Sequence, residues 1–120
     1  MVFATSTSDF QVLAGSAGFL LAAYKVGCVG GICALANVLG EEVCELGELA
    51  QSTDSKAAQD LQLRLVGPNS CVTGRFGVPG LKTAMDWFGY YGGPTRSPLQ
   101  PLSDANTEAM KAEFQKSQFL

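Results

Sequence analysis

The chain has 120 residues, of which 47% are hydrophobic and 16% are charged, and it carries a formal net charge of −3. A chain of this length suits a single domain, and its charged fraction lies below the roughly 25% of an ordinary soluble domain. Nucleic-acid binding is disfavoured, because eight basic residues against eleven acidic ones do not supply the basic face that phosphates require. The low charge instead favours a chain that other protein covers on several sides.

The cysteines form no metal-binding or disulfide pattern. They are Cys28, Cys33, Cys44 and Cys71, and the chain has neither a CxxC pair nor a histidine, so we expect no metal and four free thiols. The most apolar run, residues 12–35, is interrupted by Ser16, Lys25 and several glycines. It is therefore not expected to cross a membrane, which takes ~20 consecutive apolar residues.

The first third of the chain predicts a strand, a helix and a second strand. Phe10–Ala14, FQVLA, is a short apolar run closed by Gly15, as in a strand. Ser16 is suited to cap the following helix, and Gly27 is suited to end it. Gly30–Asn37, GGICALAN, is apolar at consecutive positions, which is typical of a strand covered on both faces in a parallel sheet. The order is that of a βαβ unit.

Helices dominate the expected remainder. Apolar residues at helical spacing predict one helix over 39–50 and another that Asp54 caps. Pro68 is expected to kink or break this second helix. A short helix over Leu81–Phe88, an extended connection over Tyr90–Leu102 and a last helix from the cap Ser103 to about Gln115 complete the pattern.

The predicted elements divide the chain into an unstructured leader at 1–8, two βα units at 9–50 and a C-terminal helical extension at 51–120. Two parallel strands leave unpaired backbone groups on both outer edges. Strands that are apolar on both faces also need a cover on each side, and the few helices of this chain supply only one. The sequence therefore predicts an incomplete unit.

Two blocks carry a resemblance to a known family. DFQVLAGSAGFLLAAYKVGCVGGICALANV, residues 9–38, and RFGVPGLKTAMDWFGYYGGPTRSPLQPLS, residues 75–103, resemble the C-terminal third of mitochondrial 4-hydroxy-2-oxoglutarate aldolases of the dihydrodipicolinate synthase and N-acetylneuraminate lyase family. The resemblance implies an α/β fold: the C-terminal part of a TIM (β/α)₈ barrel with a C-terminal helical extension. Phe10–Ala14 and Gly30–Ala36 would be strands seven and eight of an incomplete barrel, because a whole one takes ~250 residues.

The resemblance further implies a class I aldolase that splits 4-hydroxy-2-oxoglutarate into glyoxylate and pyruvate during hydroxyproline catabolism. In such enzymes a lysine amine forms a Schiff base with the keto carbon, and this requires a desolvated amine of lowered pKa. The family places this lysine on strand six and a proton-shuttling tyrosine on strand five, both before Asp9. We therefore expect no catalytic residue and no cofactor in this chain, and surface positions for its five lysines. A fragment or short isoform of this kind would be inactive alone.

Two residues are expected at the substrate site by the same resemblance. Gly15 matches a glycine that contacts the substrate at the end of strand seven, where the lack of a Cβ lets the backbone approach a keto acid. Ile32 matches a position on strand eight whose backbone carbonyl faces the pyruvate pocket. An ordinary turn for Gly15 and plain core packing for Ile32 remain alternatives.

Other interpretations stay open at this point. The chain could be a non-catalytic partner of full-length subunits, or a small-anion-binding module built on the glycine turn AGSAG. The aromatic segment WFGYYGG, Trp87–Gly93, is expected to pack an irregular connection onto the core or to fill a subunit contact. The family resemblance implies assembly as tetramers and a mitochondrial location, although MVFATSTS is not a recognisable presequence.

Overall fold

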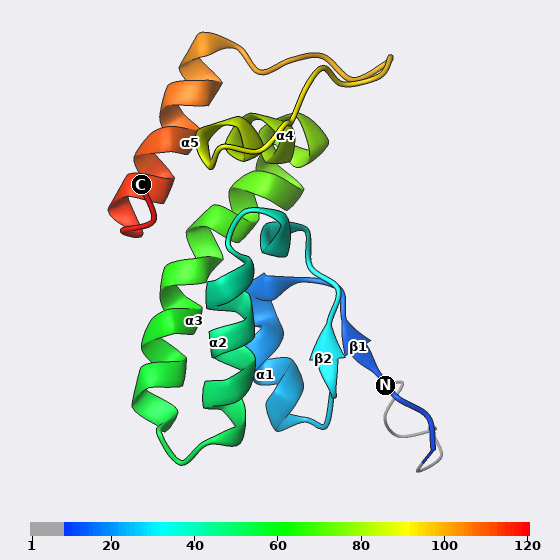
Figure 1. The fold of residues 1–120 in the computed structure, drawn as a ribbon, viewed down its shortest axis with the longest axis vertical. Helices are drawn as coiled ribbons and strands as arrows, with labels where there is room; N and C mark the ends of the chain where they lie inside the picture. Colours follow the sequence, from blue (N-terminus) through cyan, green and yellow to red (C-terminus); the bar gives the residue numbers. More distant parts are fainter. Residues whose placement is uncertain (1–8) are drawn as a thin grey trace.

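The computed structural model describes residues 9–120. Figure 1 shows two strands beside α1, α2 and α3, with α4 and α5 at the other end of the long axis. The predicted leader at 1–8 lies outside the described residues. The bounds in chain order are β1 (Leu13–Ala14), α1 (Leu20–Lys25), β2 (Gly30–Gly31), α2 (Gly40–Gln51), α3 (Ser55–Ser70), α4 (Gly77–Trp87) and α5 (Asp104–Lys116).

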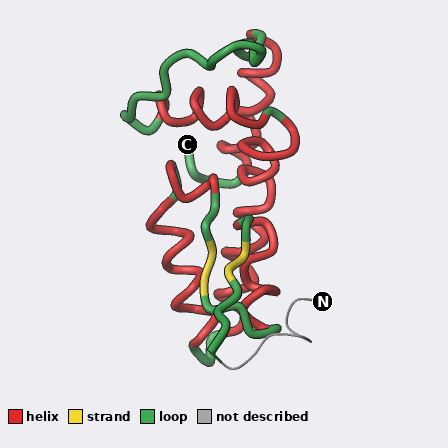
Figure 2. The backbone as a smooth tube through the Cα atoms, turned by 90° about the vertical axis from the view of Figure 1, so that its right-hand side faces the viewer, coloured by secondary structure: helices red, strands yellow, loops and turns green. Residues whose placement is uncertain are grey.

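The two strands are parallel and very short. Leu13 pairs with Gly30 and Ala14 pairs with Gly31, and the strands run side by side in Figure 2. The expected strand over Phe10–Ala14 is thus reduced to its last two residues. Within residues 9–120 each strand has a partner on one side only, and a single neighbour supports few ladder hydrogen bonds.

The prediction of one strand over Gly30–Asn37 was wrong beyond Gly31, where β2 ends. Ala34–Asn37 form a 3₁₀ helix that leads into α2. Leu35 at its centre is fully buried, and Val38 and Leu39 are also buried. The consecutive apolar residues thus reflect a buried helical turn, which sequence periodicity does not distinguish from a strand covered on both faces.

All three predicted helix caps are confirmed. The Ser16 hydroxyl accepts a hydrogen bond from the backbone N–H of Gly18, the Asp54 carboxylate one from Ala57, and the Ser103 hydroxyl one from Asn106. The donor–acceptor distances are 3.2, 3.0 and 3.3 Å. Gly27 has a φ of 102° after α1, as expected of a glycine that ends a helix.

Pro68 does not break its helix. α3 continues to Ser70 and passes directly into a π-helical turn over Cys71–Arg75. The chain changes direction at this turn and at Gly77, whose φ is 59°. Pro68 is fully buried within this helix, and its missing N–H removes one hydrogen bond of the helix.

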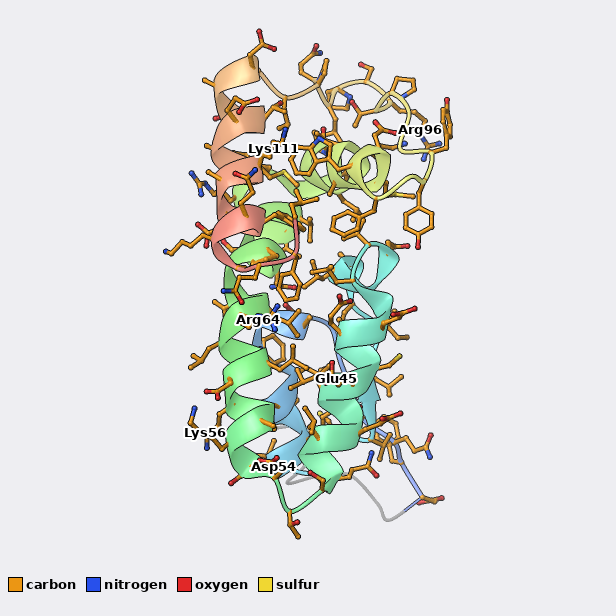
Figure 3. All side chains as sticks on the ribbon, turned by 60° about the vertical axis from the view of Figure 1, so that its left-hand side comes forward. Glu45, Asp54, Lys56, Arg64, Arg96 and Lys111 are labelled. Atoms are coloured by element: carbon orange, nitrogen blue, oxygen red, sulfur yellow. The ribbon has the colours of Figure 1, made fainter. Side chains whose placement is uncertain are left out.

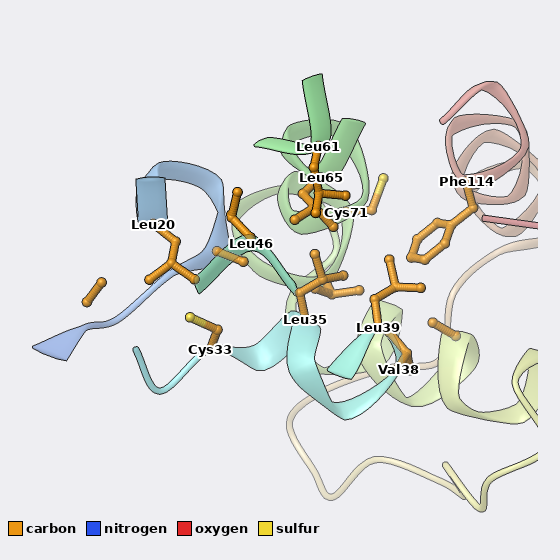
Figure 4. Packing of buried hydrophobic residues seen from close by; sticks show 14 of the residues in the cluster. Leu20, Cys33, Leu35, Val38, Leu39, Leu46, Leu61, Leu65, Cys71 and Phe114 are labelled. Carbon is orange, nitrogen blue, oxygen red and sulfur yellow. The ribbon is translucent and has the colours of Figure 1, made fainter. Parts of the chain in front are cut away.

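A single hydrophobic core joins the sheet to the C-terminal helices. Its fully buried side chains extend from Leu20 on α1 through Leu35 and Leu65 to Phe114 on α5 (Figure 4). The Phe114 ring meets the ring of Trp87 edge-on, at 5.9 Å between centroids. The C-terminal helices therefore pack as part of the same body as the two strands.

The expected irregular connection is present, since residues 91–103 contain no helix or strand. Two hydrogen bonds of Gly92 hold the start of this connection against α4. The N–H of Gly92 donates to the Asp86 carboxylate at 2.9 Å, and its carbonyl accepts a hydrogen bond from the Lys82 ammonium. A Cβ at Gly92 would lie 1.8 Å from the backbone oxygen of Lys82. Only glycine fits this approach.

Candidate functional site

Gly15 and Ile32 lie next to each other at the carboxyl ends of the two strands. They directly follow Ala14 and Gly31, which are paired in the sheet. The N–H of Ile32 donates to the carbonyl of Ala14 at 2.8 Å. Active sites of (β/α)₈ barrels lie at this end of the strands. The fold thus brings the two residues predicted for the substrate site to one place, and their contact with substrate stays a prediction.

Nothing in the described chain requires a glycine at position 15. A Cβ there would meet no heavy atom within 4 Å, and Gly15 is not among the glycines with positive φ. The space beside the Gly15 backbone is therefore open in the described chain. Ile32 is similarly open, with 76% of its surface exposed, so it is not packed in the core of the described residues.

Gly31 has a structural role that the sequence analysis missed. A Cβ at Gly31 would lie 2.9 Å from both the Cys33 sulfur and a methyl group of Leu20. The strand backbone therefore rests directly on buried side chains. Burial raises the pKa of the Cys33 thiol above its ordinary value, which keeps it protonated and makes it a poor nucleophile.

None of the five lysines belongs to a strand, and three of them have a hydrogen-bond or ion-pair partner elsewhere in the chain. Lys25 donates to the carbonyl of Ala50 at 3.0 Å, and Lys56 on the outer side of α3 pairs with Asp60 (Figure 3). Lys111 and Lys116 are exposed on α5. Lys82 corrects the expectation of solvated lysines, because it is half-buried and donates to a loop carbonyl. None of these amines lies in β1 or β2, where a Schiff-base lysine could be desolvated.

Two N–H groups at the start of the first helix already have partners within the chain. The Gly18 N–H is taken by the Ser16 hydroxyl, and the Leu21 N–H donates to the Gln62 side chain at 2.8 Å. No lysine or arginine occurs between Gly15 and Lys25. Two donors and a nearby positive charge are thus not available to a small anion in this segment, which disfavours the anion-binding interpretation.

Residues 9–120 contain no group of three histidine, cysteine, aspartate or glutamate side chains that could hold a metal ion. In the same part of the chain, no helix has the length and apolar character that a membrane crossing requires.

The aromatic segment after α4 is divided between core and surface. Trp87 and Phe88 pack against Phe114, as expected for a structural role. Tyr90 and Tyr91 are 58% and 82% exposed. Tyr90 also lines a cleft of ≈ 290 Å³ together with Ala36, Val38, Gly40, Glu41, Glu42 and Phe88. The carboxylates of Glu41 and Glu42 make this cleft unsuited to an anionic keto acid.

Comparison with known proteins decides the family. The model of the dihydrodipicolinate synthetase family matches residues 2–117. The chain belongs to this family. A DapA-like lyase of Halobacterium salinarum is 34% identical over 106 residues, which cover 88% of this chain and 35% of that protein. The 4-hydroxy-tetrahydrodipicolinate synthase of Thermoanaerobacter sp. is 29% identical over 108 residues, or 90% of this chain and 36% of the relative.

Solved structures of the family superpose on most of the chain. Dihydrodipicolinate synthase DapA-2 from Bacillus anthracis has a TM-score of 0.87 at 29% identity, covering 95% of this chain and 39% of that one. The enzyme from Cyanidioschyzon merolae, crystallised with lysine bound, has a TM-score of 0.85 at 18% identity, covering 99% and 40%. The predicted fold class is confirmed: the described residues are part of a TIM barrel with an open sheet. The chain spans little more than a third of the curated relatives it matches.

Proposed function

We propose that this chain supplies strands seven and eight and the C-terminal helices of a Schiff-base aldolase that splits 4-hydroxy-2-oxoglutarate into glyoxylate and pyruvate. Membership of the family supports the barrel and the lyase class. The choice of substrate rests on the resemblance of MDWFGYYGGP and RSPLQPLS to the aldolases of this substrate. The Thermoanaerobacter relative and the two solved structures carry the name of a different reaction, and the experiment below therefore tests the substrate separately.

The proposed reaction needs an amine that the rest of the barrel would provide. The amine adds to the keto carbon at C2, and loss of water gives an iminium ion. The C4 hydroxyl then loses its proton, the C3–C4 bond breaks, and its electron pair moves toward the iminium. Glyoxylate leaves, the enamine takes up a proton at C3, and hydrolysis releases pyruvate and the free amine. The described residues would form one wall of the pocket around the backbone of Gly15 and Ile32.

The proposal includes inactivity of the 120-residue chain alone. The observation that carries it is the absence of any lysine from β1 and β2 or beside Gly15. Without a desolvated amine no Schiff base forms, and the pocket has only one wall. A mitochondrial location and homo-oligomeric assembly belong to the same proposal, on the strength of the family resemblance alone.

The test compares the chain alone with a complete chain, in which these residues follow the first six βα units of a 4-hydroxy-2-oxoglutarate aldolase, so that the pocket differs from that enzyme's only in the wall around Gly15 and Ile32. Each protein is incubated with pyruvate and borohydride, which reduces a Schiff base to a stable amine, and intact mass is measured. We expect an adduct on the complete chain only, and glyoxylate release from 4-hydroxy-2-oxoglutarate by that chain only. An adduct on the chain alone would refute the assignment of the amine to the missing strands. An adduct with pyruvate but no release of glyoxylate would refute the proposal that 4-hydroxy-2-oxoglutarate is the substrate.

A second candidate function is that of a non-catalytic partner of full-length subunits. The observation in its favour is the apolar surface of the strand region, where Phe10, Leu13 and Val29 are 60%, 50% and 55% exposed. Co-expression with a full-length family member distinguishes the two. Co-purification in a fixed ratio would support the partner role, and separate elution would count against it.

A further inference from the structure

The loop that follows β1 is held by α3, a helix that lies outside the two βα units. The Asn69 side chain donates from Nδ2 to the Ser16 hydroxyl at 3.0 Å, and this hydroxyl lies 3.3 Å from Oδ1 of the same residue. Asn69 is only 6% exposed and is the one buried polar side chain of the described residues. Both polar atoms of its side-chain amide thus lie within hydrogen-bond distance of a single residue of this loop.

The close approach of Asn69 also accounts for a glycine in the loop. A Cβ at Gly18 would lie 2.7 Å from Nδ2 of Asn69. The motif AGSAG therefore contains two residues, Ser16 and Gly18, whose identity fits the side chain of α3 rather than a ligand. This gives a physical reason for part of a motif that otherwise suggests anion binding.

A second side chain of α3 holds the same segment. Gln62 accepts a hydrogen bond from the N–H of Leu21 and donates one to the carbonyl of Ala17, both at 2.8 Å. One amide thus bridges two backbone groups at the start of the helix. Together, Gln62 and Asn69 bind the chain on both sides of Gly18.

Gly15 has no such support of its own. A side chain at Gly15 would meet nothing within 4 Å, so no packing around this position fixes its place. Its backbone is fixed by the strand hydrogen bonds before it and by Ser16 after it. Any shift of the loop therefore moves the backbone of Gly15 directly.

We infer that Asn69 and Gln62 are positioning residues, through which the C-terminal helical extension sets the place of the Gly15 backbone and hence the affinity for a keto acid. This inference rests on the proposed function of that site. Neither side chain need touch the substrate. Both act by holding the loop that does, and a displacement of about 1 Å in such a contact can cost up to ~100-fold in activity.

The test uses the complete chain with the variants Asn69→Leu and Ser16→Ala, singly and combined. Asn69→Leu keeps the volume but removes both polar contacts. The rate of borohydride trapping is measured against pyruvate concentration. We expect the half-saturating concentration to rise about 10- to 100-fold, with a smaller change in the limiting rate because the amine is untouched. The double variant should be little worse than the worse single one, because both lose the same contact.

The matched control is Met110→Ala on α5. Met110 is fully buried and lies in the part of the core that α4 and α5 form, so the substitution lowers thermal stability without touching the loop. The half-saturating pyruvate concentration of Met110→Ala should stay within about twofold of the wild-type value, since distant sites act independently. If Asn69→Leu weakened pyruvate binding only by destabilising the protein, Met110→Ala would raise the half-saturating pyruvate concentration as well. An equal rise in both variants would overturn the inference.

The outcomes separate the inference from the function on which it rests. If the wild-type complete chain is trapped and Asn69→Leu has unchanged pyruvate dependence, positioning by α3 is refuted and the proposed function stands. If the wild-type complete chain is not trapped, the proposed function fails and the inference fails with it. Trapping with a selective rise in the Asn69→Leu half-saturation supports both.

Discussion

Leu13→Glu tests the conclusion that this sheet requires further strands. Leu13 lies in β1, next to the buried Ala14, and is 50% exposed in the described chain. Full burial of a leucine contributes about 1.5–3 kcal/mol, so the present contacts of Leu13 contribute about 1 kcal/mol. In the chain alone, Leu13→Glu should therefore lower the free energy of unfolding by only about 1 kcal/mol.

The same substitution should cost far more in the complete chain. There the neighbouring strands would cover the rest of Leu13, and the substitution would lose the whole burial term of about 2 kcal/mol. It would also bury a carboxyl without a partner, which adds several kcal/mol in measured cases. We expect a total loss of about 4 kcal/mol or more.

The assay is urea unfolding of both proteins, followed by circular dichroism. Leu63→Glu is the matched control, because Leu63 lies on α3 with 71% of its surface exposed and receives the same added charge. Its cost should stay below about 1 kcal/mol in both proteins. Equal costs of Leu13→Glu and Leu63→Glu in the complete chain would refute the reasoning, because the face of β1 that carries Leu13 would then remain uncovered.

Three further predictions concern the core and its thiols. Phe114→Ala should lower the free energy of unfolding by about 3–5 kcal/mol, because the ring is fully buried against Trp87. A loss below about 1 kcal/mol in urea unfolding would contradict this packing. Gly92→Ala should cost about 1–3 kcal/mol and shift the thermal midpoint downward, because the new methyl group would meet a carbonyl of α4. Burial raises the pKa of the Cys33 and Cys71 thiols above their ordinary value of 9.0. The unfolded chain then loses these protons first, so stability should fall as the pH rises through 9 and above; a free energy of unfolding that stays constant between pH 8 and 10 would contradict the burial of both thiols.

Local signals in the sequence were reliable where the physics is local. Ser16, Asp54 and Ser103 were predicted as caps because a short side-chain oxygen reaches the free N–H groups of the next turn, whatever the rest of the fold does. Gly27 was predicted to end its helix for a similar reason. The strand over Gly30–Asn37 was predicted too long, because consecutive apolar residues indicate burial and do not by themselves distinguish a strand from a 3₁₀ turn.

The candidate site was only partly predictable. Gly15 and Ile32 were predicted from a resemblance, and parallel pairing then explains why they lie side by side. The contacts of Asn69 with Ser16 and Gly18 carried no sequence signal. They join residues more than 50 positions apart, and an isolated asparagine near a proline is typical of a helix end.

The sequence alone indicated that this chain is part of something larger, because two parallel strands with no further strand predicted beside them leave unpaired backbone groups on both outer edges. It also determined where α3, α5 and the 3₁₀ turn before α1 begin, since capping depends on three or four consecutive residues. Only the tertiary structure decided that the C-terminal extension shares one core with the strands and holds the loop after β1. That outcome depends on which side chains of α3 meet the strand end, and such long-range contacts are set by packing rather than by any local pattern.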